Sequence, residues 1–236
     1  MIKFRYAPSY ARITAKDEPA GASTETIADL IHRLGDIDPQ RILLHPAPGT
    51  ATEEDLIQLL EGMDKRIFEL IDGVLVEKVA STPEGMLAAF IGRQIGIFAD
   101  RKKLGLIGDG ATSFRFRLKL IRVPDVSFVS WNRIPEDSFP EDAVTSVVPD
   151  LAVEVLSPSN TVAEIELKLD HYFECGVRLA WIIDPKKKTA KVYTSRSRVK
   201  VIDATGELSG GKVLPGFQLP MRDIFNYLLR PKPKRR

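Results

Sequence analysis

Glu154 is the residue whose surroundings most clearly suggest chemistry, because it is a carboxylate within the largely apolar run of residues 149–156. Its neighbours are typical of a short buried strand, which ends at the turn-forming residues 157–160. Removing water from a charged side chain costs several kcal/mol, so a buried carboxylate is paired, protonated or bound to a metal ion. A structural ion pair or an exposed sheet face explains Glu154, taken alone, about as well as a functional site does.

A second carboxylate, Asp125, follows a proline at the start of another predicted strand. Period-two alternation places Asp125 and Ser127 on one strand face, with Val126 and Phe128 on the other. Taken alone, Asp125 is more simply a turn or sheet-edge carboxylate. If its strand neighbours that of Glu154, the two carboxylates can bind one divalent ion, and such oxygen ligands suit Mg²⁺ or Mn²⁺.

Lys168 is the third candidate, in a helix predicted at about residues 161–175. It lies on the flank of the apolar stripe of that helix, from which its ammonium could reach the end of the Glu154 strand. A lysine and a metal ion together would hold an attacking water molecule and stabilise the charge that develops on a phosphate. A surface lysine paired with Glu164 is the simpler explanation of Lys168 by itself.

The elements that must position these residues are predicted from periodicity and turn signals. Residues 67–79 are typical of a β-hairpin with a tight Asp72-Gly73 turn, and a long helix is predicted from Pro83 to about Lys103. Further strands are predicted at about 112–120, 124–130, 178–184, 189–194 and 198–202. Antiparallel strands followed by a strand–helix–strand unit predict an α/β fold, in which a mixed β-sheet is flanked by α-helices.

The chain is predicted to divide into three parts. Residues 1–65 comprise an irregular arm and two short helices, which begin at Ser23 or Thr24 and near Thr52, as an accessory layer without evident chemistry. Residues 66–229 form the main domain. Residues 230–236 form a basic C-terminal tail, which either contacts phosphates or is simply solvated.

The composition indicates a globular protein. The 236 residues are 44% hydrophobic and 28% charged, and no stretch is apolar enough to span a bilayer. The start of the chain does not resemble a signal peptide, so a cytoplasmic location is expected. A single cysteine, Cys175, excludes an internal disulfide framework and a multi-cysteine zinc site. The net charge of +2 is too small to indicate nucleic-acid binding by itself.

Four blocks of the chain resemble, in the same order, those of the Uma-type putative restriction endonucleases, a family of the PD-(D/E)XK nuclease superfamily. They are residues 68–73 (FELIDG), 123–129 (VPDVSFV), 150–160 (DLAVEVLSPSN) and 176–185 (GVRLAWIIDP). The resemblance covers about residues 66–229. It implies a restriction-endonuclease-like mixed sheet between helices, with a divalent metal ion at Asp125 and Glu154.

The resemblance also bears on the remaining site residues. In the superfamily pattern the lysine lies two residues after the glutamate, where this chain has Leu156. Members of the family carry it on the following helix instead, which points to Lys168. Many superfamily members place an additional acid at the start of the first long helix, and Glu84 matches that position, with Glu69 and Glu77 as alternatives.

The expected function is therefore that of a Mg²⁺- or Mn²⁺-dependent endonuclease that hydrolyses phosphodiester bonds, most readily in DNA. The alternative is a catalytically silent nucleic-acid-binding or protein-interaction module that retains the nuclease fold. Arg115, Arg117 and Lys119 are predicted to share one strand face, and are candidates for phosphate contacts. No membrane association is expected, and a homodimer is left open.

Overall fold

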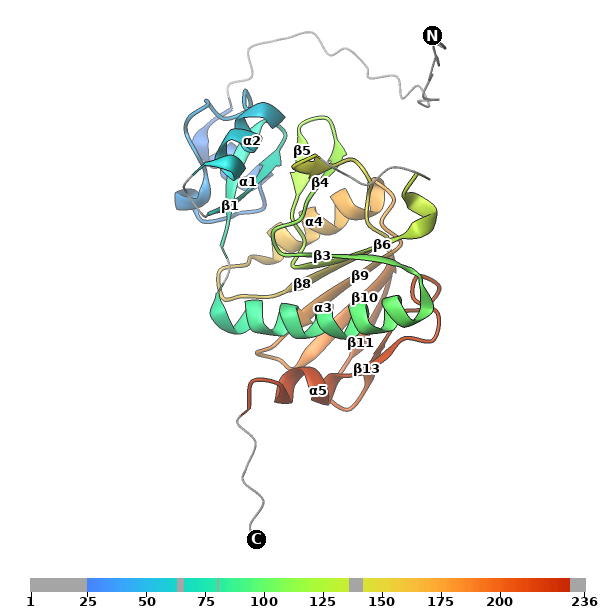
Figure 1. The fold of residues 1–236 in the computed structure, drawn as a ribbon. Coiled ribbons are helices and arrows are strands. Elements are labelled where there is room, and N and C mark those ends of the chain that lie inside the picture. Colours follow the sequence, from blue (N-terminus) through green and yellow to red (C-terminus); the bar gives the residue numbers. More distant parts are fainter. Residues whose placement is uncertain (1–24, 63–65, 80, 136–141, 230–236) are drawn as a thin grey trace, which may run out of the picture.

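The computed structural model describes residues 25–62, 66–79, 81–135 and 142–229, so the predicted arm and basic tail lie outside the described residues (Figure 1). The helices are α1 (Ile27–Arg33), α2 (Glu53–Glu61), α3 (Thr82–Lys102), α4 (Val162–Glu174) and α5 (Met221–Asn226), with 3₁₀ turns η1 (Pro39–Arg41) and η2 (Trp131–Arg133). The strands are β1 (Ile67–Ile71), β2 (Val74–Lys78), β3 (Gly105–Asp109), β4 (Ser113–Arg117), β5 (Leu120–Arg122), β6 (Val126–Ser130), β7 (Val144–Thr145), β8 (Leu151–Val155), β9 (Leu179–Asp184), β10 (Thr189–Ser195), β11 (Arg198–Ile202), β12 (Glu207–Ser209) and β13 (Gln218–Pro220).

The central sheet confirms the predicted mixed sheet flanked by helices. Its six strands lie in the order β11-β10-β9-β8-β6-β3. Strands β8 and β9 are parallel and are connected through α4, whereas the other neighbouring pairs are antiparallel. The strand of Glu154 is therefore an inner strand, between β9 and the strand that follows Asp125.

Helix α3 covers one face of this sheet (Figure 1). Its apolar residues recur at intervals of three and four, so they form one stripe against the sheet. The helix has a proline in its first turn and is capped at its C-terminal end by Lys103, whose backbone is left-handed with a φ of 54°. The buried contact includes Leu87, Phe90, Ile91 and Ile95 of the helix and Val126, Phe128, Val153 and Trp181 of the sheet.

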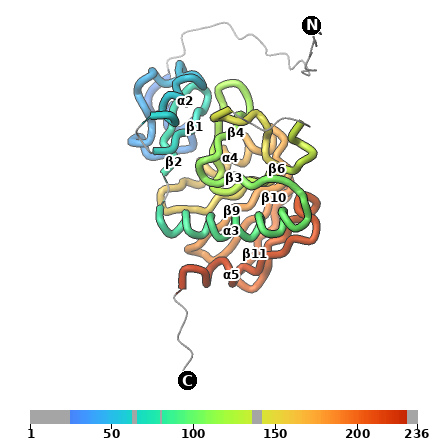
Figure 2. Tube along the Cα trace, viewed as in Figure 1, coloured from blue at the N-terminus to red at the C-terminus, as the bar shows by residue number. Residues whose placement is uncertain are grey.

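Helix α4 covers the opposite face (Figure 2). The hydroxyl of Thr161 caps the helix by accepting a hydrogen bond from the backbone N–H of Glu164 at 2.9 Å. Ile165 and Leu169 pack on Ala180 and Ile182 of β9. The two helices therefore enclose the sheet, and side chains at alternating positions of β8 point to one helix or the other.

A second sheet of five strands, in the order β2-β1-β5-β4-β7, is covered by α2. The buried residues at this contact are Leu56 of the helix and Phe68, Leu70, Leu75 and Ile121 of the sheet. The prediction of one continuous strand at about 112–120 is wrong. The segment turns at Leu118 and Lys119, so that β4 and β5 pair antiparallel, with an irregular register between Arg115 and Arg117.

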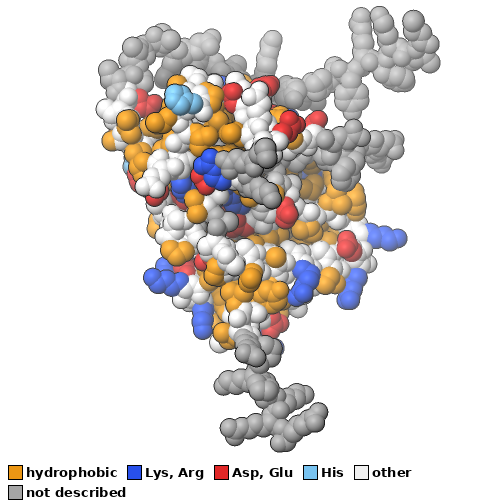
Figure 3. Space-filling model, turned by 60° about the vertical axis from the view of Figure 1, so that its left-hand side comes forward, with side chains coloured by type: hydrophobic (Ala, Val, Ile, Leu, Met, Phe, Trp, Pro, Cys, Tyr) orange, Lys and Arg blue, Asp and Glu red, His pale blue; other side chains and the backbone are white. Residues whose placement is uncertain are grey.

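Because of this turn, the prediction that Arg115, Arg117 and Lys119 share one strand face is also wrong. Lys119 lies outside both strands, with a φ of 57°, and its side chain donates to the carbonyl of Gly49. Arg115 pairs with Glu53, and Arg117 pairs with Asp72 at 2.8 Å. Figure 3 shows one face of the molecule, on which Lys and Arg side chains are dispersed among other types. None of the described helices is both long and apolar enough to cross a bilayer.

Candidate active site

The pairing of β6 with β8 brings Asp125 and Glu154 together. Val126 lies opposite Val153, and the backbone N–H of Asp125 donates to the carbonyl of Val153 at 3.0 Å. Continuing the antiparallel register by one residue places Asp125 opposite Glu154. Since Val126 and Val153 face α3, both carboxylates lie on the face towards α4.

Glu154 is almost fully buried and is held by two residues of α4. One carboxylate oxygen accepts from Lys168 Nζ at 2.8 Å, and the other accepts from the hydroxyl of Tyr172. Burial raises the pKa of Glu154, Lys168 opposes this increase and Asp125 adds to it. The structure therefore places Glu154 and Lys168, two of the residues predicted from sequence, in direct contact.

Lys168 is only 3% exposed, so it is not the surface lysine of the simpler interpretation. Burial by itself lowers the pKa of a lysine, but the carboxylates of Glu154, Glu69 and Glu164 reverse this and hold the pKa of Lys168 above its ordinary value. Its side chain therefore carries a fixed positive charge beside Glu154.

Asp125 has a partner that sequence reasoning missed. Lys78, at the end of β2, approaches one carboxylate oxygen of Asp125 at 2.8 Å and also donates to the carbonyl of Val123 at 2.6 Å. The other oxygen of Asp125 accepts from the backbone N–H of Val155 at 2.7 Å. No local signal identifies Lys78, because it comes from the other sheet. Tyr172, by contrast, could have been found, since it lies one helical turn beyond Lys168.

These side chains line one small cavity of about 40 Å³, which we call the carboxylate cavity. Its lining includes Asp125, Glu154, Lys168, Lys78 and Glu84. One carboxylate oxygen of Glu84 is buried and has no hydrogen-bond partner within the described part of the chain. Such a group costs free energy unless a cation or a water molecule satisfies it.

The two alternatives for the additional acid lie elsewhere. Glu77 pairs with Arg66 at 3.1 Å. Glu69 is buried, and its carboxylate accepts from Arg122 Nη1 at 2.7 Å and from the backbone N–H of Val123 at 2.9 Å. Burial raises its pKa, but Lys168 and Arg122 outweigh this effect and lower the pKa of Glu69 to about 2. Of the three candidates, Glu84 is the one that lines the carboxylate cavity.

The oxygen donors of the carboxylate cavity suit a hard divalent cation. In the described part of the chain, no three Asp, Glu, His or Cys side chains lie where they could hold one metal ion together. Mg²⁺, however, binds proteins through one or two carboxylates and completes its shell with water or phosphate oxygens. Asp125 and Glu154 supply two carboxylates, and Glu84 lines the same cavity without completing a three-residue group. The residues present therefore fit such an ion.

A buried contact between Arg122 and His171 predicts that the protein loses stability in acid. Arg122 donates to Nδ1 of His171, and burial together with this neighbouring charge lowers the pKa of His171 to about 3. Between about pH 6.5 and pH 3 the unfolded chain therefore binds a proton that the folded protein does not, so stability increases with pH in this window. Since a tenfold difference in proton affinity is worth about 1.4 kcal/mol, the loss on acidification amounts to a few kcal/mol.

We expect His171→Gln to flatten the dependence of the urea midpoint on pH between 6.5 and 4.5, because an amide oxygen can accept from Arg122 without titrating. Below about pH 4.5 a second loss remains in both proteins, because Glu69 has a folded pKa of about 2. His32→Gln is the matched control, since His32 is largely exposed. An unchanged slope in His171→Gln would contradict this assignment.

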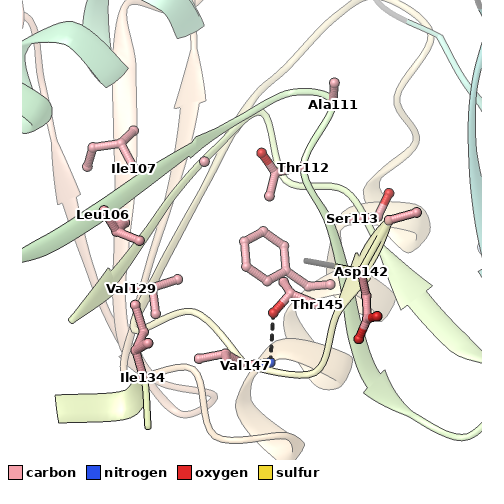
Figure 4. Close-up of a pocket in the computed structure, with 13 residues that line it drawn as sticks. Leu106, Ile107, Ala111, Thr112, Ser113, Val129, Ile134, Asp142, Thr145 and Val147 are labelled. Atoms are coloured by element: carbon pink, nitrogen blue, oxygen red, sulfur yellow. Dashed lines mark hydrogen bonds between the residues drawn. The ribbon is translucent and has the colours of Figure 1, made fainter. Parts of the chain in front are cut away.

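A larger pocket of about 300 Å³ offers different chemistry (Figure 4). Leu106, Ile107 and Val129 lie on one side of it, and Asp142 and Thr145 lie on the other. Asp142 is the one charged side chain among the described residues that line this pocket. The larger pocket therefore lacks the paired carboxylates and lysines of the carboxylate cavity.

Comparisons with known proteins concern the family and the fold of the chain. The model of the Uma2 family, described as putative restriction endonuclease, matches residues 53–222. A crystal structure of a putative nuclease belonging to DUF820 from Anabaena variabilis has a TM-score of 0.64 and 21% sequence identity. The alignment covers 75% of this chain and 99% of the other, which shows a common fold. None of the curated proteins matches the chain.

Proposed function

Since the chain belongs to the Uma2 family of putative restriction endonucleases, we propose that it is an endonuclease that hydrolyses phosphodiester bonds in DNA with Mg²⁺ or Mn²⁺. The observation that carries this proposal is the convergence of Asp125, Glu154 and Lys168 on one cavity. Asp125 directly precedes β6, Glu154 lies in β8 and Lys168 lies in α4, so only the fold brings them together.

In this proposal each side chain has a distinct role. Asp125 and Glu154 hold the ion, with Glu84 as the additional acid. When bound, the ion would act as a Lewis acid and would make water a better nucleophile. Lys168 keeps its proton at Nζ, and so donates hydrogen bonds to the attacking water and to the phosphate oxygens. Two further residues orient the carboxylates: Tyr172 contacts Glu154, and Lys78 contacts Asp125.

The proposal is tested by incubating purified protein with supercoiled plasmid in Mg²⁺, in Mn²⁺ and in EDTA. We expect nicked or linear product with either ion and none with EDTA. The ions should also raise the melting temperature, because they bind the folded site and not the unfolded chain. Glu84→Gln should reduce the increase in melting temperature that the ions cause. A protein that cuts neither DNA nor RNA with either ion would contradict the endonuclease proposal.

A catalytically silent nucleic-acid-binding module is the second candidate, and one observation favours it. Each central carboxylate already has a lysine partner, Asp125 with Lys78 and Glu154 with Lys168, so neither needs a metal ion for charge balance. This candidate predicts DNA binding without cleavage, and a melting temperature that does not respond to millimolar Mg²⁺ or Mn²⁺.

A further inference from the structure

Arg41 reaches the carboxylate cavity from outside the part of the chain that the family model matches. It ends the 3₁₀ turn η1, whereas the matched region begins at residue 53. The residue is 6% exposed and lines the same cavity as Asp125, Glu154 and Lys168. A segment that the sequence marks as an accessory layer without chemistry therefore contributes a cation to the candidate site.

The guanidinium of Arg41 has one unused donor group. Its Nε donates to the carbonyl of Glu77 at 2.9 Å, and its Nη2 donates to Glu164 at 2.7 Å. Its Nη1 is buried and has no hydrogen-bond partner among the described residues. A buried N–H without an acceptor is unfavourable, and no described residue accepts from this group within hydrogen-bonding distance, so it is available to an incoming acceptor.

The position of Arg41 is fixed by tight docking of its segment. Gly35 has a φ of +89°, and a Cβ at this residue would lie 2.6 Å from the Cα of Glu164, so only glycine permits this approach to α4. The hydroxyl of Thr161 donates to the carbonyl of Gly35. On the other side, Ile42 forms a β-bridge with Val76 of β2. The segment therefore packs against both the first turn of α4 and the edge of the second sheet.

We propose that Arg41 donates from Nη1 to a non-bridging oxygen of the DNA phosphate that enters the carboxylate cavity, so that the N-terminal segment completes the active site. The proposal rests on the proposed endonuclease function. The planar fork of arginine matches phosphate geometry, and here one arm is fixed by Glu164 while the other is available. The cavity, at about 40 Å³, exceeds the roughly 10–15 Å³ that one water molecule needs, so it has room for an oxygen of the phosphate while the rest of the phosphodiester stays outside.

The competing role for Arg41 is structural, since it could serve only to neutralise Glu164. A double variant separates the two roles. Arg41→Met leaves Glu164 buried with Asn160 as its remaining side-chain partner, whereas Arg41→Met/Glu164→Gln removes both charges. Removing both partners of a buried pair is far less destabilising than removing one. We therefore expect the double variant to recover most of the melting temperature that Arg41→Met loses.

The experiment compares four variants with the wild type: Arg41→Met, Arg41→Lys, the double variant, and Arg33→Met as a control. Arg33 lies in the same segment, but it pairs with Glu25 at the surface. Cleavage of a labelled DNA duplex gives kcat and KM. Fluorescence anisotropy in EDTA gives the affinity for the same duplex at several salt concentrations, independently of any metal ion.

If Arg41 contacts phosphate, Arg41→Met and the double variant should both cleave about 100- to 1,000-fold more slowly, the usual effect of losing one preorganised donor. For both variants, the plot of log affinity against log salt should become less steep by about 0.9, the amount that one phosphate contact contributes. Arg41→Lys keeps a cation beside Glu164 and should fold, but it should remain defective because it lacks the fork. Arg33→Met should match the wild type.

The proposal would be overturned if the double variant cleaved DNA at the wild-type rate and its affinity had the wild-type salt dependence. Arg41 would then act only on Glu164. A wild-type protein that binds DNA without cutting it would contradict the endonuclease function, while the salt slopes would still decide the role of Arg41. A wild-type protein that neither binds nor cuts DNA would contradict both.

Discussion

Asp125→Asn should reduce metal-dependent DNA cleavage by roughly a thousandfold or more, the upper range for one electrostatic group in an active site. The substitution removes the negative charge that is proposed to hold the ion and preserves the shape of the side chain. An asparagine oxygen can still accept the hydrogen bond that Asp125 receives from the backbone of Val155. The substitution also leaves Lys78 without its anionic partner, although Lys78 keeps its hydrogen bond to the carbonyl of Val123. We therefore expect a folded but less stable protein, whose melting temperature no longer rises as strongly with Mn²⁺.

Asp184→Asn provides a matched control for this variant. Asp184 ends β9, the strand beside β8, and its carboxylate pairs with Lys187 rather than lining the carboxylate cavity. It should cleave DNA at the wild-type rate. If Asp125→Asn cleaves as fast as this control, Asp125 does not hold a catalytic metal ion.

Substituting Glu154 is a less specific test than substituting Asp125, although both carboxylates have the same proposed role. From sequence alone, replacement of either carboxylate is expected to relieve repulsion between like charges and so to leave the fold intact. The structure changes this expectation for Glu154, because its removal leaves Lys168 buried without its direct partner. Breaking a buried pair in this way typically costs about 3–5 kcal/mol. Loss of activity in Glu154→Ala would therefore combine chemistry with destabilisation.

The part of the site that could be predicted from sequence depends on strand periodicity. Alternation in β6 and β8 assigns Asp125 and Glu154 to defined strand faces, and antiparallel pairing then places them opposite each other. The helical period places Lys168 on the flank of the buried stripe, where the structure shows it in contact with Glu154. These features depend on short segments whose burial is evident from their composition.

The remaining part depends on contacts between distant segments, which no local pattern encodes. Lys78 belongs to a hairpin of the second sheet, whereas Asp125 precedes a strand of the central sheet, and nothing near Lys78 indicates Asp125 as its partner. Arg41 lies in a segment with ordinary helix and loop signals, and its position depends on the close approach of Gly35 to Glu164. The turn at Lys119 was missed because Arg115 and Arg117 alternate with phenylalanines, which also suits one continuous strand.

Lys168→Met should lose cleavage by about 100- to 1,000-fold and should also destabilise the protein by about 3–5 kcal/mol. The rate falls because the fixed positive charge is lost, and stability falls because Glu154 is left buried without its direct lysine partner. Lys168→Met/Glu154→Gln should regain most of the stability, since both charges are absent, and none of the activity. Melting temperatures and plasmid cleavage of the three proteins provide this comparison.

The pH dependence of Lys168→Met distinguishes a buried carboxylate from a general packing defect. In the wild type, Lys168 opposes the effect of burial on the pKa of Glu154. Without this lysine the folded pKa of Glu154 rises further above its unfolded value, so the folded variant binds a proton more readily than the unfolded chain does. Its stability is then greatest below the unfolded pKa and decreases as the pH rises through the folded pKa. The difference in melting temperature between variant and wild type should therefore be largest near pH 8 and should narrow towards pH 5. A difference that is constant over this range, or full metal-dependent cleavage by Lys168→Met, would show that Lys168 does not have the role proposed for it.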